Sequence, residues 1–459
     1  MTSPDNSTQR PLSGTELLAF GFPAMSHALV AGAVYTVLPT HYAANTAITL
    51  AQIGTVAGLS RIIDALNDPL MGFLSDRTRS RFGSRKPWIA AAILFCVAAV
   101  FQLFSPPRDA TWVYFLVWSQ VLYTGFTMFE VPRSAWGAEI SRDYNERAKI
   151  GMYVGGFNIA GALSFYLVPI AMGMLGGSSE ITGETLGLIA WIYAIVMPVG
   201  ILACLWIVPQ GRKVDHKQTT LRDVGTTILR SLPARRLFAI VSLWGVGQGA
   251  FVGCAFIFYS GYMGLGKSFA MIMGLLFLVQ VLALPIWSRI LPRFDRHRVW
   301  AFCIGGSALL APLLLLLPRG EAALPWLLPL VVAQAFLMAP PNFLPGAVLG
   351  DVIDYDTLKS GTNKAGNLFA VHMVLIKVAM ALGGAVAFNL LELVGYKVNQ
   401  ANSDFANHGL LAVFIGIPLV FHGAMAALAW NFPLGRRRHG IISRRLQSRR
   451  LPLADPALE

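Results

Sequence analysis

The chain has 459 residues, of which 55% are hydrophobic and only 13% are charged. A soluble protein of this length carries about twice that charged fraction, and apolar runs of about 20 residues, long enough to cross a bilayer core, recur along the sequence. These features exclude a soluble globular protein and predict an all-α, polytopic membrane protein.

Twelve membrane-spanning helices are predicted, in two groups of six. A hydrophilic, basic stretch after the sixth span separates the groups. The predicted domains are a six-helix bundle over 1–208, a cytoplasmic linker over 209–236, a second six-helix bundle over 237–433 and a basic cytoplasmic tail over 434–459. The expected spans are roughly 15–42, 49–75, 88–104, 110–135, 150–175, 185–208, 237–261, 268–290, 299–317, 324–350, 366–392 and 409–432.

The net charge of +13 is concentrated in the loops on one side of the predicted helices. Cytoplasmic loops carry an excess of Lys and Arg, so this side is predicted to be cytoplasmic, with both termini there and the protein in the inner (plasma) membrane. This placement argues against a nucleic-acid partner. The tail, GRRRHGIISRRLQSRR, is expected to lie against anionic lipid, with binding of another protein as the alternative. The opposite loops hold Arg108, Lys267, Arg319 and Lys397.

Two short matches indicate that the halves are related. RFGSRKPW after span two pairs with RFDRHRVW after span eight, and PRSAWG near the end of span four pairs with PGAVLG near the end of span ten. Both matches have nearly the same offset along the chain. Parallel six-helix repeats are the architecture of major facilitator transporters, so we expect two pseudo-symmetric bundles of that fold.

Span two contains charged residues in an otherwise apolar segment, SRIIDALNDPLMGF. A carboxylate near the bilayer centre costs about 2.5–3.5 kcal/mol on insertion scales, so it must be neutral, paired, hydrated or bound to a cation. Asp64 and Asp68 are four residues apart and share a helix face, and Arg61 belongs to the same stripe. At the repeat offset the second half has no acid, which suggests an ion or proton site in the first half alone.

A second acid-bearing segment, GFTMFEVPRSAW, lies in span four. The helical rise allows Asp64, Asp68, Thr127 and Glu130 to meet at one level, slightly cytoplasmic of the midplane. Carboxylate and hydroxyl oxygens are the ligands that a small cation prefers, so Asp64, Asp68 and Glu130 are predicted to bind Na⁺ if the protein is sodium-coupled. The same groups could take a proton instead. The structural alternative is that Arg61 simply neutralises Asp64.

Lys377 lies well inside span eleven. By helical rise it reaches the level of Asp64 from the opposite half, so it is predicted to couple ion and substrate binding; a fixed ion pair is the alternative. Six further residues are expected to line a central cavity between the two halves. Each has a purely structural alternative, since buried histidines commonly form hydrogen bonds between helices and aromatic residues commonly serve as packing. These residues are Arg61, Arg133, His27, Tyr35, Trp136 and His372.

Charged residues outside the spans are expected to form clamps between helices that stabilise one access state. Asp76 and Arg77 follow span two, and Asp351 and Asp354 lie in an acidic segment, 350–366, that we expect to be a loop. The sequence contains no phosphate-binding loop, metal-finger spacing or nucleophile elbow. We therefore expect a protein that is not an enzyme and needs no cofactor beyond a coupling ion.

The segment RIIDALNDPLMGFLSDRTRSRFGSRKPW, with TMFEVP, GDVIDYDTLKSG and VLIKVAM, strongly resembles the glycoside–pentoside–hexuronide:cation symporters, the melibiose-permease-like branch of the major facilitator superfamily. The resemblance implies that Asp64, Asp68 and Glu130 form the cation site, with Glu in place of the more typical Asp. It also implies that Thr127 is the neighbouring hydroxyl and Lys377 the span-eleven lysine. Secondary active uptake driven by Na⁺ or H⁺, through alternating access, is the implied activity.

Two departures bear on the substrate. Melibiose-type members bind sugar with an acid in span one and an arginine in span five, and neither is present here. We therefore expect cation-coupled symport of a glycoside or related small polar solute, and Arg133 with Lys377 makes an anionic solute such as a hexuronide a hypothesis. The alternatives are a cation-coupled lysophospholipid transporter, and a membrane-embedded sensor or assembly factor. A monomer is expected.

Overall fold

The computed structural model describes residues 12–140, 144–210, 231–361 and 365–450. Within them the regular structure is helical, and ten helices are long and apolar enough to cross a membrane. Two further helices, α4 (Leu50–Arg77) and α6 (Trp112–Ile140), have 28 and 29 residues, which exceeds the length needed to span. These are the helices that carry the predicted cation site. The all-α, polytopic membrane fold is confirmed.

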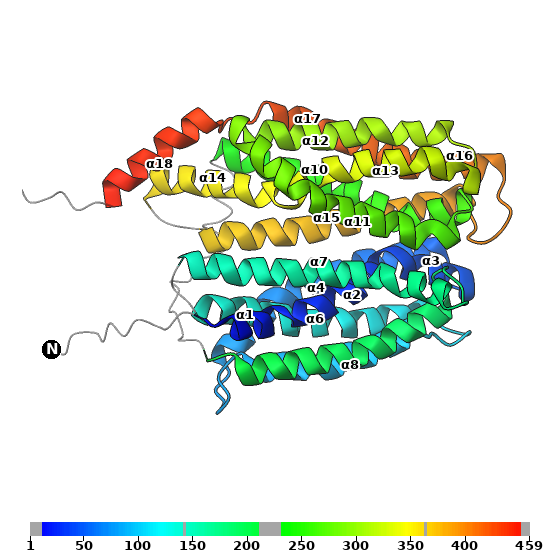
Figure 1. Ribbon diagram of the computed structural model, residues 1–459, viewed down its shortest axis with the longest axis horizontal. Coiled ribbons are helices and arrows are strands. Elements are labelled where there is room, and N and C mark those ends of the chain that lie inside the picture. The colour runs from blue at the N-terminus through cyan, green and yellow to red at the C-terminus, as the bar shows by residue number, and fades with distance from the viewer. Residues whose placement is uncertain (1–11, 141–143, 211–230, 362–364, 451–459) are drawn as a thin grey trace, which may run out of the picture. The chain divides into compact units, whose positions relative to one another are not determined.

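The chain divides into two compact units. Unit 1 comprises Met1–His216 with Gly266–Gly274, and unit 2 comprises Lys217–Leu265 with Leu275–Glu459. Figure 1 shows the helices of each unit lying alongside one another. The helices of unit 1, in addition to α4 and α6, are α1 (Gly14–Gly21), α2 (Pro23–Gly32), α3 (Leu38–Asn45), α5 (Lys86–Phe104), α7 (Tyr144–Met174) and α8 (Gly183–Ile207).

Unit 2 contains the remaining helices, including one in the C-terminal segment. They are α10 (Leu232–Phe256), α11 (Gly266–Ile290, whose first residues belong to unit 1), α12 (Arg296–Leu310), α13 (Leu324–Met338), α14 (Leu344–Ser360), α15 (Ala365–Leu393), α16 (Asp404–Leu411), α17 (Ile417–Trp430) and α18 (Arg436–Arg450). The predicted span 15–42 is divided into α1, α2 and α3 by Pro23 and a π-helical turn over Ala33–Val37. Wider turns of this kind insert one residue into the helical ladder.

Four features differ from the sequence-based expectation. The acidic segment 350–366 was expected to be a loop, but α14 continues to Ser360, so Asp351 and Asp354 lie on a helix. The predicted span 324–350 is interrupted where Pro340 and Pro341 start a 3₁₀ turn, because proline cannot donate to the α-helical ladder. The basic tail also contains a helix, α18. Helix α10 begins at Leu232, inside the predicted linker, because Ser231 caps it.

Each unit contains a pair of helices whose backbones approach closely at a glycine. In unit 1, α2 packs on α7, where a Cβ added to Gly161 would lie 2.1 Å from the carbonyl oxygen of Met25. In unit 2, α10 packs on α15, where a Cβ added to Gly249 would lie 1.8 Å from the carbonyl oxygen of Met380. Small residues let helix backbones approach closely in membranes. In both units, therefore, a glycine allows the helices of the first and fifth predicted spans to pack closely.

Candidate functional site

Two acids and one hydroxyl meet where α4 packs on α6 in unit 1. The Oγ1 atom of Thr127 lies 3.1 Å from Oδ1 of Asp64 and 3.0 Å from Oδ1 of Asp68. Asp64 and Thr127 are buried and Asp68 is half-buried. The four-residue spacing on α4 puts both carboxylates on the face that packs against α6. We call Asp64, Asp68 and Thr127 the acid site.

A proline lies near the acid site in each of its two helices. Pro69 follows Asp68 inside α4, and Pro132 follows Glu130 by two residues inside α6. Both helices continue through these prolines. A proline within a helix removes one backbone hydrogen bond and leaves a carbonyl oxygen to be satisfied otherwise. Each helix therefore has one backbone carbonyl oxygen near the site that lacks its usual donor.

Arg61 is held between aromatic rings next to the acid site. Its guanidinium carbon lies 4.8 Å from the ring centroid of Tyr35 and 4.6 Å from that of Tyr123. Its Nη1 atom is 3.5 Å from Oδ2 of Asp64, a long ion pair. Aromatic faces attract a guanidinium without neutralising it, so the rings position Arg61 while leaving its charge directed at Asp64.

Glu130 is bound to Arg133 on the same helix. Nη2 of Arg133 donates to both carboxylate oxygens of Glu130, at 2.8 and 2.9 Å. Within the described residues, no group of three or more His, Cys, Asp or Glu side chains is arranged to hold a metal ion. The structure therefore brings Asp64, Asp68 and Thr127 together and places Glu130 in an ion pair one turn further along α6. Arg133 itself is buried, with its guanidinium 4.9 Å from the ring of Phe129.

The other residues predicted to line the cavity fall into two groups: two contact aromatic rings in unit 1, and two lie on a helix of unit 2. His27 lies in edge contact with Phe126, at 4.3 Å between ring centroids. Trp136 is buried against Phe20, and its Nε1 donates to the carbonyl oxygen of Pro209 at 3.1 Å. Both contacts fit the packing alternative. Lys377 and His372 lie on α15 of unit 2, half-buried and buried respectively, so their relation to the acid site stays a prediction.

The sequence reasoning overlooked two neighbours of the acid site. Tyr123, one turn before Thr127 on α6, supplies the second ring against Arg61. Asn67 donates to Oγ1 of Thr124 at 3.1 Å, which adds a second polar contact between α4 and α6. The four-residue spacing of Tyr123 and Thr127 puts them on one helix face and could have identified the tyrosine. Nothing in the sequence alone pairs Asn67 with Thr124.

The first predicted clamp, formed by Asp76 and the arginines after span two, is centred on Arg85. Arg85, next to α5, forms an ion pair with Asp76 and another with Glu139 at 2.8 Å, and it donates to the hydroxyl of Ser75 at 2.8 Å. Asp76 lies in the last turn of α4 and Glu139 near the end of α6. Arg85 therefore ties three spans of unit 1 together. Arg77, by contrast, lies over the ring of Phe73 at 3.9 Å.

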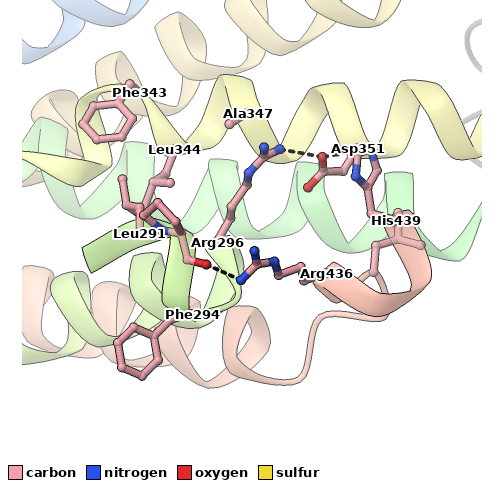
Figure 2. A pocket seen from close by; sticks show the side chains of 11 residues that line it. Leu291, Phe294, Arg296, Phe343, Leu344, Ala347, Asp351, Arg436 and His439 are labelled. Carbon is pink, nitrogen blue, oxygen red and sulfur yellow. Dashed lines mark hydrogen bonds and ion pairs between the residues drawn. The ribbon is translucent and has the colours of Figure 1, made fainter. Parts of the chain in front are cut away.

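The second predicted clamp is in unit 2 (Figure 2). Nη1 of Arg296 on α12 lies 2.7 Å from Oδ1 of Asp351 on α14. His439 on α18 lies 3.4 Å from the same Asp351 oxygen and 3.1 Å from Oδ2 of Asp354. Burial raises the pKa of Asp351 above its ordinary value, although Arg296 and His439 act in the opposite direction. Asp351 thus connects three helices.

These features define a class of protein: a polytopic helical transporter with a charged site buried in one of its two compact units. The chain belongs to the MFS/sugar transport protein family, whose model matches residues 19–436. This confirms the resemblance to melibiose-permease-like symporters. The protein is therefore a sugar-type membrane transporter with a small-molecule substrate, and it is not an enzyme.

Relatives and solved structures agree with this family. The chain is 25% identical to the isoprimeverose transporter of Lactiplantibacillus pentosus, over 87% of this chain and 84% of that one. It is 24% identical to YagG of Escherichia coli K12, provisionally named a glycoside/cation symporter, over 86% of each chain. A crystal structure of the nucleoside transporter NupG aligns with a TM-score of 0.67 at 14% identity, over 90% of this chain and 100% of that one. That last likeness concerns the fold.

Proposed function

We propose that this protein is a symporter that uses Na⁺ or H⁺ to drive uptake of a glycoside or a related small polar solute by alternating access. One observation carries the proposal: the Thr127 hydroxyl lies within hydrogen-bond distance of two carboxylates. A hydroxyl has a single hydrogen and cannot donate fully to both. A Na⁺ ion or a proton among these oxygens would satisfy the second contact.

The ligands proposed for the coupling ion are Asp64, Asp68 and Thr127. Glu130 is proposed as a fourth ligand, because each carboxylate oxygen that accepts a hydrogen bond from Arg133 keeps a second lone pair for a cation. An anionic substrate such as a hexuronide stays a hypothesis that rests on the positive charges of Arg133 and Lys377. The names of the relatives support a sugar-type solute and cation coupling.

We also propose the orientation and assembly. The concentration of Lys and Arg in loops on one side supports both termini in the cytoplasm and a location in the inner (plasma) membrane. The protein is proposed to act as a monomer.

The test is uptake by purified protein in vesicles, with and without an imposed Na⁺ or pH gradient. A panel of neutral glycosides, uronates and lysophospholipids would be compared between wild type and Asp68→Asn. We expect one gradient to drive uptake of a sugar-type solute, and Asp68→Asn to lower that uptake by more than about tenfold, since an uncharged amide cannot replace the carboxylate. Gln280→Asn, at the corresponding position of unit 2, is the control and should retain gradient-driven uptake.

Three outcomes would contradict the proposal. Uptake that needs no gradient and persists in Asp68→Asn would mean a facilitator with structural acids. Uptake of lysophospholipids in place of sugars would favour the alternative carrier. Equal loss in Asp68→Asn and Gln280→Asn would mean that both changes simply damage the protein.

A further inference from the structure

Unit 2 contains a pocket, which we call the α18 pocket. It has a volume of about 440 Å³ and is lined by residues from the turn that follows α11, from α12 and α14, and from the start of α18 with the segment before it. Pockets that hold small molecules have volumes of about 300–1,000 Å³. The α18 pocket is therefore large enough for a charged headgroup with the first carbons of an attached chain.

The lining is polarised from one end to the other. Figure 2 shows the rings of Phe294 and Phe343 at one end, Asp351 and His439 at the other, and the guanidinium groups of Arg296 and Arg436 between them. Phe294 is 58% exposed and Phe343 is 40% exposed. Exposed aromatic rings favour an apolar contact, so this pocket suits a molecule with one charged end and one apolar end.

Arg436 is the cation available to a ligand in the α18 pocket. Arg296 already forms an ion pair with Asp351, with 2.7 Å between Nη1 and Oδ1. The Arg436 side chain donates to the carbonyl oxygen of Pro292, and among the described residues no carboxylate lies within ion-pair distance of its guanidinium. Its five N–H donors form a fork that matches the oxygens of a phosphate. The backbone N–H of Arg436 donates to Asp295 at 2.8 Å, which fixes where α18 starts.

We propose that the α18 pocket binds an anionic phospholipid, with the phosphate on Arg436 and the beginning of an acyl chain against Phe294 and Phe343. The surroundings support a lipid as the source of the phosphate. The apolar end adjoins α11, a candidate membrane span, and the charged end adjoins α18, whose sequence RRRHGIISRRLQSRR contains no acid. Basic segments next to a membrane span attract anionic lipids. The bound lipid would hold α18 against α12 and α14.

The proposal is tested by titrating purified full-length protein in detergent with dioleoylphosphatidylglycerol and dioleoylphosphatidylcholine, and counting bound lipids by native mass spectrometry. We expect tighter binding of the phosphatidylglycerol. Arg436→Gln should weaken that binding about tenfold, the loss of one charge-assisted contact. Arg293→Gln removes the same charge from a neighbouring arginine that does not line the pocket, and should change binding by less than about twofold.

A second variant and two competitors separate a lipid from free phosphate. Phe294→Ser leaves the polar contacts of the α18 pocket intact and should also weaken phosphatidylglycerol binding. Equal losses in Arg436→Gln and Arg293→Gln would overturn the proposal, because they would indicate attraction to overall charge. So would displacement by inorganic phosphate or glycerol 3-phosphate together with normal binding in Phe294→Ser. If Arg436→Gln does not fold, the Phe294→Ser variant tests the proposal by itself. Unchanged phosphatidylglycerol binding in that variant would overturn the proposal.

Discussion

Both units place polar side chains between their second and fourth spans, but they differ in charge. In unit 1 the contact joins Asp64 and Asp68 on α4 to Thr127 on α6. In unit 2 the contact is neutral: Nδ2 of Asn342 donates to Oε1 of Gln280 at 3.0 Å. An amide pair supplies both donor and acceptor, whereas carboxylates only accept, and in unit 1 they face the Thr127 hydroxyl and the Arg61 guanidinium. The fold therefore holds this junction together without acids, and the acids of unit 1 need another explanation.

The ion-pair clamps of the two units resemble each other more closely than their polar contacts between the second and fourth spans do. Each unit ties an arginine near the start of its third span to an acid near the end of its fourth, Arg85 to Glu139 in unit 1 and Arg296 to Asp351 in unit 2. A feature that occurs in both units is best explained by the architecture they share. A feature that occurs in one unit is best explained by function, and four changes test this distinction.

The largest expected effect is the loss of the unit 1 clamp. Arg85→Ala should destabilise the protein by about 3–5 kcal/mol, because it leaves Glu139 as a buried carboxylate without its ion pair. Arg296→Ala should cost about 1 kcal/mol or less, because Arg296 is 51% exposed and water screens its pair with Asp351. The melting temperatures of the purified variants measure the difference. Equal drops would mean that exposure does not decide the strength of these clamps.

The next effect concerns helix packing that both units share. Gly161→Ala adds a methyl group where the carbonyl oxygen of Met25 is 2.1 Å away, so α2 and α7 must separate, at a cost of about 1–3 kcal/mol. Gly156→Ala, on the same helix, has no atom within 4 Å of the added carbon and is the control. Melting temperature again gives the readout, and a tolerated Gly161→Ala would contradict the close contact.

A smaller effect is expected from the hydroxyl of the acid site. Thr127→Val keeps the shape of the side chain and removes the oxygen that joins both acids, so activation of transport by the coupling ion should require an about tenfold higher ion concentration. Thr124→Val, three residues earlier, removes the hydroxyl that accepts from Asn67 and should leave ion activation unchanged. Ion titrations of vesicle uptake measure both. A shift in Thr124→Val equal to that in Thr127→Val would contradict a specific role.

The smallest effect is a pH dependence of stability from Asp351. Burial raises its pKa above the ordinary value of 3.8, so the folded protein binds this proton more tightly than the unfolded chain does. Stability should therefore fall as the pH rises from 3.8 through the raised pKa. Melting temperatures of wild type and Asp351→Asn across this range measure the contribution. The same slope in both proteins would assign the dependence to other groups.

The sequence alone determined the class of fold and the identity of the unusual acids. Hydrophobic runs report membrane spans because each residue contributes independently to the cost of leaving water. The spacing of Asp64 and Asp68 puts them on one face because a helix is regular. Both inferences use only neighbouring residues. The break at Pro340 was also readable in principle, since proline acts on its own helix.

Only the tertiary structure decided which side chains meet. The Thr127 hydroxyl joins both acids, Tyr35 and Tyr123 enclose Arg61, and Glu130 accepts hydrogen bonds from Arg133. Helical rise predicts the depth of a residue, but the rotation of each helix and the rotamers of its side chains depend on packing against neighbouring helices. For the same reason the α18 pocket, which draws on three helices and a turn, has no signature in the sequence beyond its row of arginines.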